Sequence, residues 1–335
     1  MLEQTARKRL FSGIQPTGEL HLGNYIGALT LWAEQQHQYA SVFCVVDLHA
    51  ITIPEAIKPE YLRRKTREAA AILMASGIDP EESAIFIQSQ IPAHTELTWI
   101  LNCVTPLGWL ERMTQFKSKS TLAESVGTGL LDYPVLQAAD VLLYKTNVVP
   151  VGEDQRQHVE LMTDIAQRFN HLYGEAFVLP QAMIRASGAR VMGLDDPTVK
   201  MSKSLGEKRK GHAIGVVDQP DVIRQAIMRA VTDSGKETHF ESASPGVKNL
   251  LVIYEVLSGQ TREEIEGLFE GKGYGVLKKA VADLVIASLE PVRNRYDRLM
   301  AEPERLEELL RGGADRVRPI ADATLKRVKE LVGLG

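Results

Sequence analysis

The stretch "LFSGIQPTGELHLGNYIGAL" (residues 10–29) indicates how the chain begins to fold. It opens on apolar residues typical of a buried strand, passes through a turn marked by Gly13 and Pro16, and continues with a helix pattern. His21 and Gly23 fall at or near the expected helix start, where unpaired backbone N–H groups favour an anion and the bare Gly23 backbone leaves room for a flat base. A capped helix after a tight turn, with His21 at the surface, explains the same pattern without a ligand.

The rest of the first 200 residues repeats this alternation of strand and helix. Short apolar, β-branched runs occur at 41–47, 83–89 and 147–152, and amphipathic segments of helix length lie at 60–76 and 154–169. Buried strands that alternate with helices predict an α/β fold with a doubly wound parallel sheet, whose ligands bind beyond the carboxyl ends of the strands. The polar residues placed there are Asp47, His49, Gln88 and the run Gly152-Glu153-Asp154.

Strand signals fade after about residue 212, and helix signals replace them. Pro220 stands near a helix start, and Thr261 precedes Glu264 by three residues in a capping-box pattern. The segments "GVLKKAVADLVIASL" and "PIADATLKRVKELVGL" also have amphipathic helix patterns. The second half is therefore expected to be an all-α C-terminal domain.

Composition limits the classes of function. The 335 residues carry 39 Lys and Arg against 43 Asp and Glu, a formal balance of −4, so a polyanion would have to be bound by local basic patches. Cys44 and Cys103 form no CxxC or Cys/His cluster, so we expect no zinc, no iron–sulfur cluster and no disulfide framework. The absence of an apolar signal core and of long apolar runs predicts a cytoplasmic protein without a membrane span.

A second motif, "KMSKS" (residues 200–204), places two lysines three residues apart among small hydroxyl residues on an expected loop. Lysine is a compact point charge, suited to a phosphate that must be held and then released. The loop could therefore fold over a triphosphate. A solvated surface loop is the alternative.

A third motif, "GLLDYPVLQAADVLLY" (residues 129–144), is expected to form a helix with Pro134 in its first turn. Tyr133, Gln137 and Asp140 are four and three residues apart, so they share one helix face. The carboxylate of Asp140 could accept a hydrogen bond from a substrate N–H or O–H. It could instead be satisfied structurally by a neighbouring helix.

A fourth motif, "VPVGEDQRQHVEL" (residues 149–161), follows another strand candidate. Gly152 would let the backbone pass close to a ligand, and Glu153 or Asp154 could accept hydrogen bonds from ribose hydroxyls. Capping of the following helix by these acids is compatible with that role.

Together these motifs resemble bacterial-type tryptophanyl-tRNA synthetases, a branch of the class I aminoacyl-tRNA synthetases. The resemblance spans nearly the whole chain and also includes "ERMTQFKSKS", "GARVMGL", "AVTDS" and "EGKGYGVLKK". It implies a Rossmann-type catalytic domain over 7–212, with a helical insertion and dimer region around 100–145, and a helical anticodon-binding domain over 213–335. It further implies a homodimer that activates L-tryptophan with ATP to tryptophanyl-adenylate and pyrophosphate, with Mg²⁺ bound through the ATP phosphates, and that charges tRNA(Trp).

The same resemblance assigns roles to individual residues. The implied catalytic residues are His21, Lys119, Lys200 and Lys203. The implied ATP site consists of Gln15, Pro16, Thr17, Gly23, Asn24, Gly152, Glu153, Asp154, Val191, Lys200, Met201, Ser202, Lys203 and Ser204. The implied tryptophan pocket consists of Asp140, as acceptor of the indole N–H, with Phe11, His49, Tyr133, Gln137, Val149, Val151 and Gln155. No metal site built from protein ligands is implied.

Two alternatives stay open at this point. Gln137 stands where many bacterial tryptophan enzymes have Met, and its spacing from Tyr133 and Asp140 is similar to that of tyrosyl-tRNA synthetases. Phe11 opposes that reading, because the tyrosine enzymes have a Tyr there that binds the substrate hydroxyl. A catalytically silent, regulatory relative that binds nucleotide or tRNA is the other alternative, and the intact loop lysines, His21 and Asp140 speak against it. Two basic runs, 208–210 and 326–329, could contact tRNA phosphates or be solvated charges.

Overall fold

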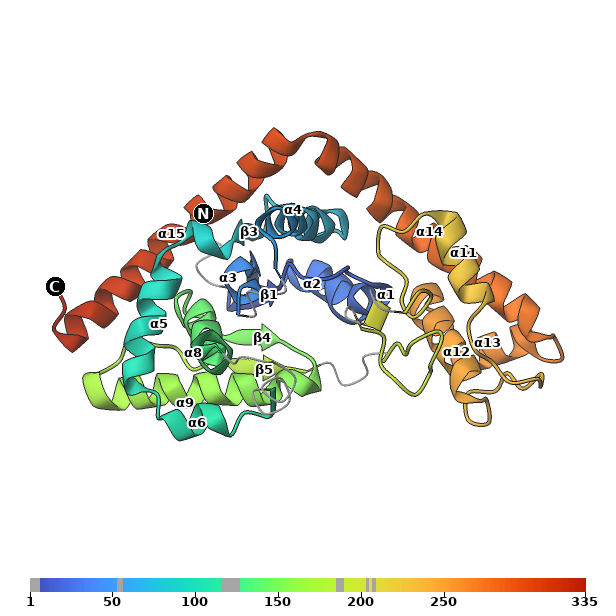
Figure 1. Cartoon of the computed structure of the whole chain (residues 1–335), viewed down its shortest axis with the longest axis horizontal. Helices are drawn as coiled ribbons and strands as arrows, with labels where there is room; N and C mark the ends of the chain where they lie inside the picture. Colours follow the sequence, from blue (N-terminus) through green and yellow to red (C-terminus); the bar gives the residue numbers. More distant parts are fainter. Residues whose placement is uncertain (1–6, 53–56, 116–126, 185–189, 203–204, 207–208) are drawn as a thin grey trace.

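The computed structural model describes residues 7–52, 57–115, 127–184, 190–202, 205–206 and 209–335. Its centre is a sheet of five parallel strands in the order β3-β2-β1-β4-β5 (Figure 1). The predicted doubly wound parallel sheet is confirmed, and the three expected runs form β2, β3 and β4. The strands are β1 (Arg9–Ile14), β2 (Ala40–Val45), β3 (Ala84–Ile87), β4 (Val148–Pro150) and β5 (Gln181–Met183).

The strand order creates a switch point beside β1. The chain runs from β1 through β2 to β3 on one side, and then continues with β4 and β5 on the other side of β1. In open parallel sheets ligands bind outside the carboxyl ends of the strands at such a point. The loops after β1 and β4 are therefore placed to form a site.

Helices cover both faces of the sheet. Leu10 and Ile14 of β1 pack in one apolar cluster, with helices α2 and α4, while Phe11 packs in the other, with α5, α8 and α9. The helices of this part are α1 (Leu22–Asn24), η1 (Tyr25–Leu29), α2 (Thr30–Gln35), α3 (Asp47–Ala50), α4 (Pro59–Ala75), η3 (Gln88–Gln90), α5 (Ala93–Val104), α6 (Leu107–Glu111), α8 (Thr128–Leu142), η4 (Glu153–Gln155) and α9 (Arg156–Tyr173).

Helix α8 corrects one local expectation. It begins at Thr128, with Gly127 as its N-cap, so Pro134 lies inside the helix instead of in its first turn. A proline at that position has no N–H to donate to the carbonyl four residues earlier. The helix nevertheless continues to Leu142, because most of its second half is buried in the core.

The chain after residue 219 is helical, as expected. It forms α11 (Pro220–Met228), α12 (Pro245–Ser258), α13 (Arg262–Phe269), α14 (Tyr274–Ala301) and α15 (Pro303–Val332). The capping box at the start of α13 is confirmed, since Thr261 N donates to Glu264 Oε2 at 2.8 Å and Glu264 N donates to Thr261 Oγ1 at 3.3 Å. None of the described helices is both long enough and apolar enough to cross a membrane.

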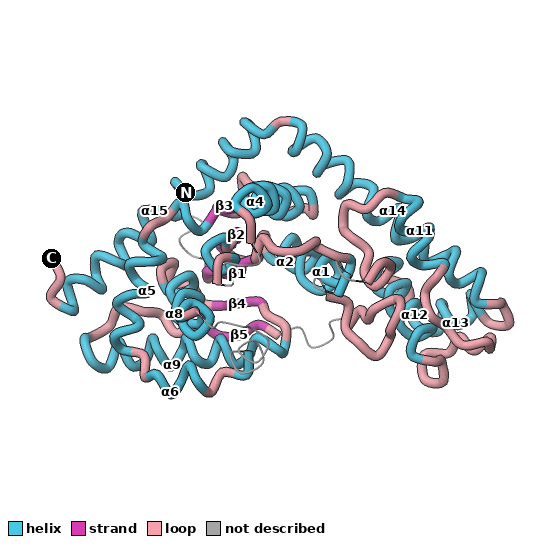
Figure 2. The backbone as a smooth tube through the Cα atoms, viewed as in Figure 1, coloured by secondary structure: helices cyan, strands magenta, loops and turns pink. Residues whose placement is uncertain are grey.

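Helix α15 runs from the end of α14 back to the sheet and packs against it (Figure 1). Figures 1 and 2 show α14 and α15 meeting at an apex, with α11 to α13 beside α14 and the sheet beneath α15. Arg316 donates to the carbonyl oxygen of Ser83 at 2.7 Å, and Arg318 donates to that of Gln90 at 3.1 Å. Val317 and Ala321 are buried in the same apolar cluster as Phe11. The last helix thus packs against the sheet, although it follows the boundary expected near residue 212.

Candidate active site

The helix that follows β1 begins at His21, as expected from the opening motif. His21 is the N-cap of α1, and its backbone N–H donates to Asn24 Oδ1 at 3.1 Å. Its side chain is buried instead of lying on the surface. A Cβ atom on Gly23 would lie 3.0 Å from His21 Nδ1 and 3.6 Å from Val191 Cβ. Gly23 is therefore closely flanked by the ring of His21, a predicted catalytic residue, and by Val191 of the predicted ATP site, which is far away in sequence.

The beginning of the "KMSKS" loop lies beside the same group. Met201 N donates to Val191 O at 3.1 Å, and the backbones of Lys200 and Met192 pair in an isolated antiparallel β-bridge. The Met201 side chain is buried, whereas Lys200 is exposed. The backbone thus anchors this loop next to the helix start while the Lys200 ammonium stays accessible to an anion. Three other predicted residues, Lys119, Lys203 and Ser204, lie outside the described part of the chain.

Asp140 lies at the centre of a buried polar cluster. The residue is 1% exposed. Its Oδ1 accepts hydrogen bonds from Gln88 Nε2 at 2.6 Å and from His94 Nδ1 at 2.6 Å, and its Oδ2 accepts one from His49 Nε2 at 2.8 Å. The structural alternative therefore holds, with donors from α3, η3 and α5. These three hydrogen bonds leave the carboxylate able to accept another one, because an ionised carboxylate has about four acceptor sites.

The cluster keeps Asp140 ionised. Burial by itself raises the pKa of a carboxyl group, but the hydrogen bonds from His49 and His94 lower the pKa of Asp140 below its ordinary value. Asp140 is thus a charged hydrogen-bond acceptor that is almost completely buried. Such an acceptor suits a single N–H donor of a ligand.

Aromatic rings surround this carboxylate. Phe11 stacks on Tyr144 with centroids 5.6 Å apart and planes inclined by 10°. His49 meets the ring of Tyr133 edge-on at 6.2 Å, and the Tyr133 hydroxyl lies 3.0 Å from His158 Nε2. Burial raises the pKa of Tyr133 to about 12, so its hydroxyl stays protonated. The other predicted pocket residues are Val149, which is buried, and Gln137, Val151 and Gln155, which are half-buried.

The residues after β4 form a turn into η4. A Cβ atom on Gly152 would lie 2.8 Å from Asp154 Oδ1, so the Asp154 carboxylate lies directly beside the glycine backbone. Gln155 Nε2 donates to Asp154 Oδ2 at 3.0 Å, and the exposed Glu153 pairs with Arg156 Nε at 2.7 Å. Asp154 therefore keeps an acceptor oxygen at the surface near a strand end.

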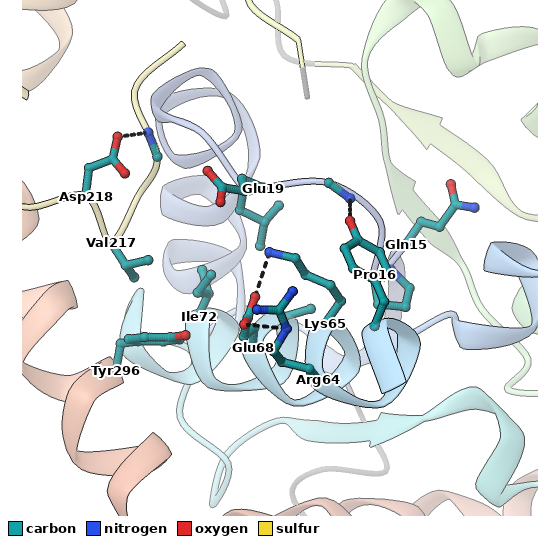
Figure 3. A pocket seen from close by; sticks show the side chains of 15 residues that line it. Gln15, Pro16, Glu19, Arg64, Lys65, Glu68, Ile72, Val217, Asp218 and Tyr296 are labelled. Carbon is teal, nitrogen blue, oxygen red and sulfur yellow. Dashed lines mark hydrogen bonds and ion pairs between the residues drawn. The ribbon is translucent and has the colours of Figure 1, made fainter. Parts of the chain in front are cut away.

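The two halves of the predicted site meet between β1 and α3. Gln15, in the loop after β1, donates from Nε2 to the carbonyl oxygen of His49 at 2.8 Å. This loop also borders an open cavity of about 280 Å³ that α4, the segment 215–218 and Tyr296 of α14 line. Figure 3 shows Gln15 pointing away from Arg64 and Lys65 of that cavity. The cavity adjoins Gln15 and Pro16 of the predicted ATP site but contains no residue of the predicted tryptophan pocket.

Sequence reasoning missed the inner partners of Asp140. The position of Gln88 after a strand predicts that it lies near the site, but no signal in the sequence gives His94 or Tyr144 a role there. His94 is a histidine on the apolar face of α5, and that pattern is also typical of a structural core residue. His94 and Gln88 lie 46 and 52 residues before Asp140 in the sequence, so only the fold brings them to its carboxylate.

Comparison with known proteins defines the class of protein. A family model described as "tRNA synthetases class I (W and Y)" matches residues 3–290. The chain therefore belongs to the class I tRNA synthetases of the tryptophan and tyrosine group, and the expected Rossmann-type fold agrees with that class.

Individual relatives narrow the class. The chain is 52% identical to the tryptophan–tRNA ligase of Gloeobacter violaceus over 333 residues, which cover 99% of this chain and 98% of that protein. It is also 52% identical to the tryptophan–tRNA ligase of Wolinella succinogenes over 98% of this chain and 99% of that protein. A solved tryptophanyl-tRNA synthetase of Campylobacter jejuni, complexed with ADP and tryptophan, is 36% identical, with a TM-score of 0.85 over 97% of this chain and all of that one (100%). Within its class, the chain belongs to the tryptophan–tRNA ligases.

Proposed function

We propose that this protein activates L-tryptophan with ATP, forming tryptophanyl-adenylate and pyrophosphate, and then transfers the tryptophanyl group to the 3′-terminal adenosine of tRNA(Trp). The observation that carries the proposal is the buried, ionised carboxylate of Asp140 at the edge of the sheet where the loop after β1 also lies. This carboxylate would accept the indole N–H. The near full-length identity with tryptophan–tRNA ligases supports the same reaction.

In the first step an oxygen of the tryptophan carboxylate forms a bond to the α-phosphorus of ATP. The bond from that phosphorus to the oxygen bridging to the β-phosphate breaks, and pyrophosphate leaves with the electron pair. No enzyme nucleophile is required, so acceleration depends on positioning and on positive charge near the phosphates. In the second step a ribose hydroxyl of the tRNA end attacks the activated carbonyl, and AMP leaves.

The phosphates would lie between the start of α1 and the "KMSKS" loop. His21 and the N–H groups at the start of the continuous helical segment 22–35 would stabilise the α-phosphate in the transition state. Lys200 would contact the leaving pyrophosphate, and Lys203 and Lys119 are proposed for the same task. These donors suit phosphate instead of a hard cation, so Mg²⁺ is proposed to bind through the phosphate oxygens, where it adds positive charge.

The nucleoside of ATP would bind to residues that follow β1 and β4, on either side of the switch point. The adenine would lie against the Gly23 backbone near Val191, whose Cβ is close to that glycine. Gly152 to Asp154 would hold the ribose region, with Asp154 as an acceptor for a hydroxyl. The other members proposed for the ATP site are Gln15, Pro16, Thr17, Asn24, Met201, Ser202 and Ser204.

The experiment that tests this function is ATP–pyrophosphate exchange with tryptophan, with tyrosine and with no amino acid, run in parallel. We expect exchange that depends on tryptophan and is negligible in the other two reactions. Exchange that depends on tyrosine would establish the tyrosine alternative. No exchange with either amino acid, in a folded protein that binds ATP, would establish the silent relative.

Replacement of Lys200 by Ala is expected to lower the kcat of tryptophan-dependent exchange about 10²-fold and to change the KM for tryptophan less than about threefold, because the ammonium meets charge that develops on pyrophosphate. Lys210→Ala is the matched control, since Lys210 is another exposed lysine that follows this loop. A Lys200→Ala variant that changes only the KM for tryptophan would contradict the role in the transition state.

The protein is proposed to act as a homodimer. Trp99 of α5 is 70% exposed and Leu107 of α6 is 59% exposed, and both lie within or next to the expected dimer region. Two copies could bury these side chains against each other. The interface is proposed from these residues and from the resemblance to the family.

Replacement of Trp99 by Glu is expected to shift the protein from dimer to monomer in light scattering after size exclusion, because the new charge would be buried in the interface. Val222→Glu is the matched control, since Val222 is 52% exposed but lies on α11. A dimeric Trp99→Glu variant, or a monomeric wild-type protein, would refute this interface.

The helical part from residue 213 onward is proposed to bind the anticodon of tRNA(Trp), and the protein is proposed to work in the cytoplasm, where tRNA is charged. The two basic runs differ in their surroundings. Lys329 pairs with Glu96 of α5 at 2.7 Å, and Arg209 lies 3.9 Å from Asp195. Lys210, Lys326 and Arg327 are exposed and are the candidates for contacts with tRNA phosphates, while Lys208 lies outside the described residues.

A further inference from the structure

The two oxygens of Asp140 have different environments. Oδ1 accepts from Gln88 and His94, both of which are completely buried. Oδ2 accepts from His49, which is 9% exposed and lies next to Tyr133. Because a carboxylate oxygen has about two acceptor sites, the described residues fill both sites of Oδ1 and only one of the two on Oδ2. A ligand must therefore approach Oδ2 from the side of His49.

The donors on the buried side are themselves held in fixed orientations. The Oε1 atom of Gln88 accepts from the backbone N–H of Leu48 at 3.1 Å, so its Nε2 amide must face Asp140. The Nδ1 atom of His94 faces a carboxylate that can only accept, so this nitrogen carries the proton. His94 Nε2 lies 2.7 Å from the hydroxyl of Tyr144. The three side chains form a chain from Tyr144 through His94 to Asp140.

Tyr144 fixes the inner end of this chain. Its ring is fully buried between Phe11 and Phe86, with centroids 5.6 Å and 5.7 Å away. Burial raises the pKa of Tyr144, so its hydroxyl remains a donor at neutral pH. A hydroxyl that donates to Nε2 favours the histidine tautomer with the proton on Nδ1. That tautomer is the one Asp140 requires.

We propose that His94, oriented by Tyr144 and assisted by Gln88, is a positioning residue that holds Asp140 with its Oδ2 directed at the indole N–H of tryptophan. This inference rests on the proposed function and assigns to the same site three residues that do not touch the substrate. It follows that His94 determines how strongly the enzyme distinguishes a substrate with a ring N–H from an isosteric one without it.

The test compares tryptophan with β-(benzothiophen-3-yl)alanine, whose sulfur replaces the indole N–H, in ATP–pyrophosphate exchange. The variants are His94→Leu, which removes the donor, and His94→Asn, whose amide nitrogen can replace Nδ1 at Asp140 but cannot reach Tyr144. Tyr144→Phe removes only the hydroxyl. KM and kcat are measured for each amino acid, and the KM for ATP and the thermal unfolding temperature are measured as controls.

We expect His94→Leu to lower kcat/KM for tryptophan about 30- to 100-fold, mainly through KM, and to change kcat/KM for the sulfur analogue less than about threefold. His94→Asn is expected to recover tryptophan use to within about fivefold of wild type, and Tyr144→Phe to lose about three- to tenfold for tryptophan alone. The KM for ATP is expected to stay unchanged. If His94→Leu does not fold, His94→Asn and Tyr144→Phe test the inference by the same comparison of tryptophan with the sulfur analogue.

Equal losses for the two amino acids would overturn the inference, since a purely structural role would affect both alike. The failure of the proposed function is a separate result: wild-type enzyme would then show no tryptophan-dependent exchange. The proposed role of His94 would then also be refuted, because it depends on tryptophan being the substrate. A wild-type enzyme that is active and prefers tryptophan, with variants that keep that preference in full, would overturn the role of His94 alone.

Discussion

An Asp140→Asn enzyme is expected to lose about 10³- to 10⁴-fold in kcat/KM for tryptophan in ATP–pyrophosphate exchange. In this variant the side-chain oxygen can still accept from Gln88 and His94, the two donors that now bind Oδ1. The amide NH₂ then replaces Oδ2 and faces the ligand. An N–H donor of the indole would meet another donor, and the buried polar groups would be left unpaired in the complex.

The control for this prediction is Asp132→Asn, on the same helix. Asp132 is half-buried and accepts from Asn102 Nδ2 at 2.8 Å, away from the Asp140 cluster. It is expected to keep exchange within about threefold of wild type. Comparable unfolding temperatures of the two variants would show that the loss at Asp140 is a loss of recognition. Near-normal exchange in Asp140→Asn would remove this residue from the tryptophan site.

Gly313→Ala is expected to lower the free energy of unfolding by about 3 kcal/mol, the largest effect on stability that we foresee for a single methyl group. A Cβ atom at this position of α15 would lie 1.9 Å from the carbonyl oxygen of Ile85 and 2.7 Å from its carbonyl carbon. Both atoms belong to the backbone of β3, so neither can rotate away. Helix α15 would have to move off the sheet, which would also strain the contacts that Arg316 and Arg318 make.

The neighbouring residue supplies a matched control. Gly312 is exposed, and a Cβ atom there would have no neighbour within 4 Å, so Gly312→Ala is expected to stabilise the protein by about 0.5–1 kcal/mol. Chemical denaturation and thermal unfolding of the two variants measure the difference. A Gly313→Ala protein as stable as Gly312→Ala would show that α15 does not pack on β3 as described.

Strands β2 to β4 and the helix start at His21 could be predicted because their signals are local, whereas the strand order and β5 could not. The apolar runs at 41–47, 83–89 and 147–152 form β2, β3 and β4, and a helix starts at His21, after the turn, as predicted. Each of these predictions depends only on residues that are close together in the sequence, within one strand or one helical turn. The capping box of Thr261 and Glu264 was predictable for the same reason.

Features that depend on contacts between distant residues could not be predicted in this way. An acidic residue on an apolar helix face indicates that Asp140 has partners, but it does not say that His49, Gln88 and His94 are those partners. The return of α15 to β3 is also invisible in its sequence, because an amphipathic helix shows only that one face is buried. A glycine within a helix often has a packing reason, but Gly312 and Gly313 look alike in the sequence and only Gly313 lies against β3.

The most direct test of the central claim is a crystal structure of the protein with tryptophan and a non-hydrolysable ATP analogue. We predict the indole nitrogen within about 3 Å of Asp140 Oδ2, at hydrogen-bond distance, and the triphosphate between the start of α1 and residues 200–204. An indole ring bound away from residue 140, or phosphates bound away from that loop, would contradict the account.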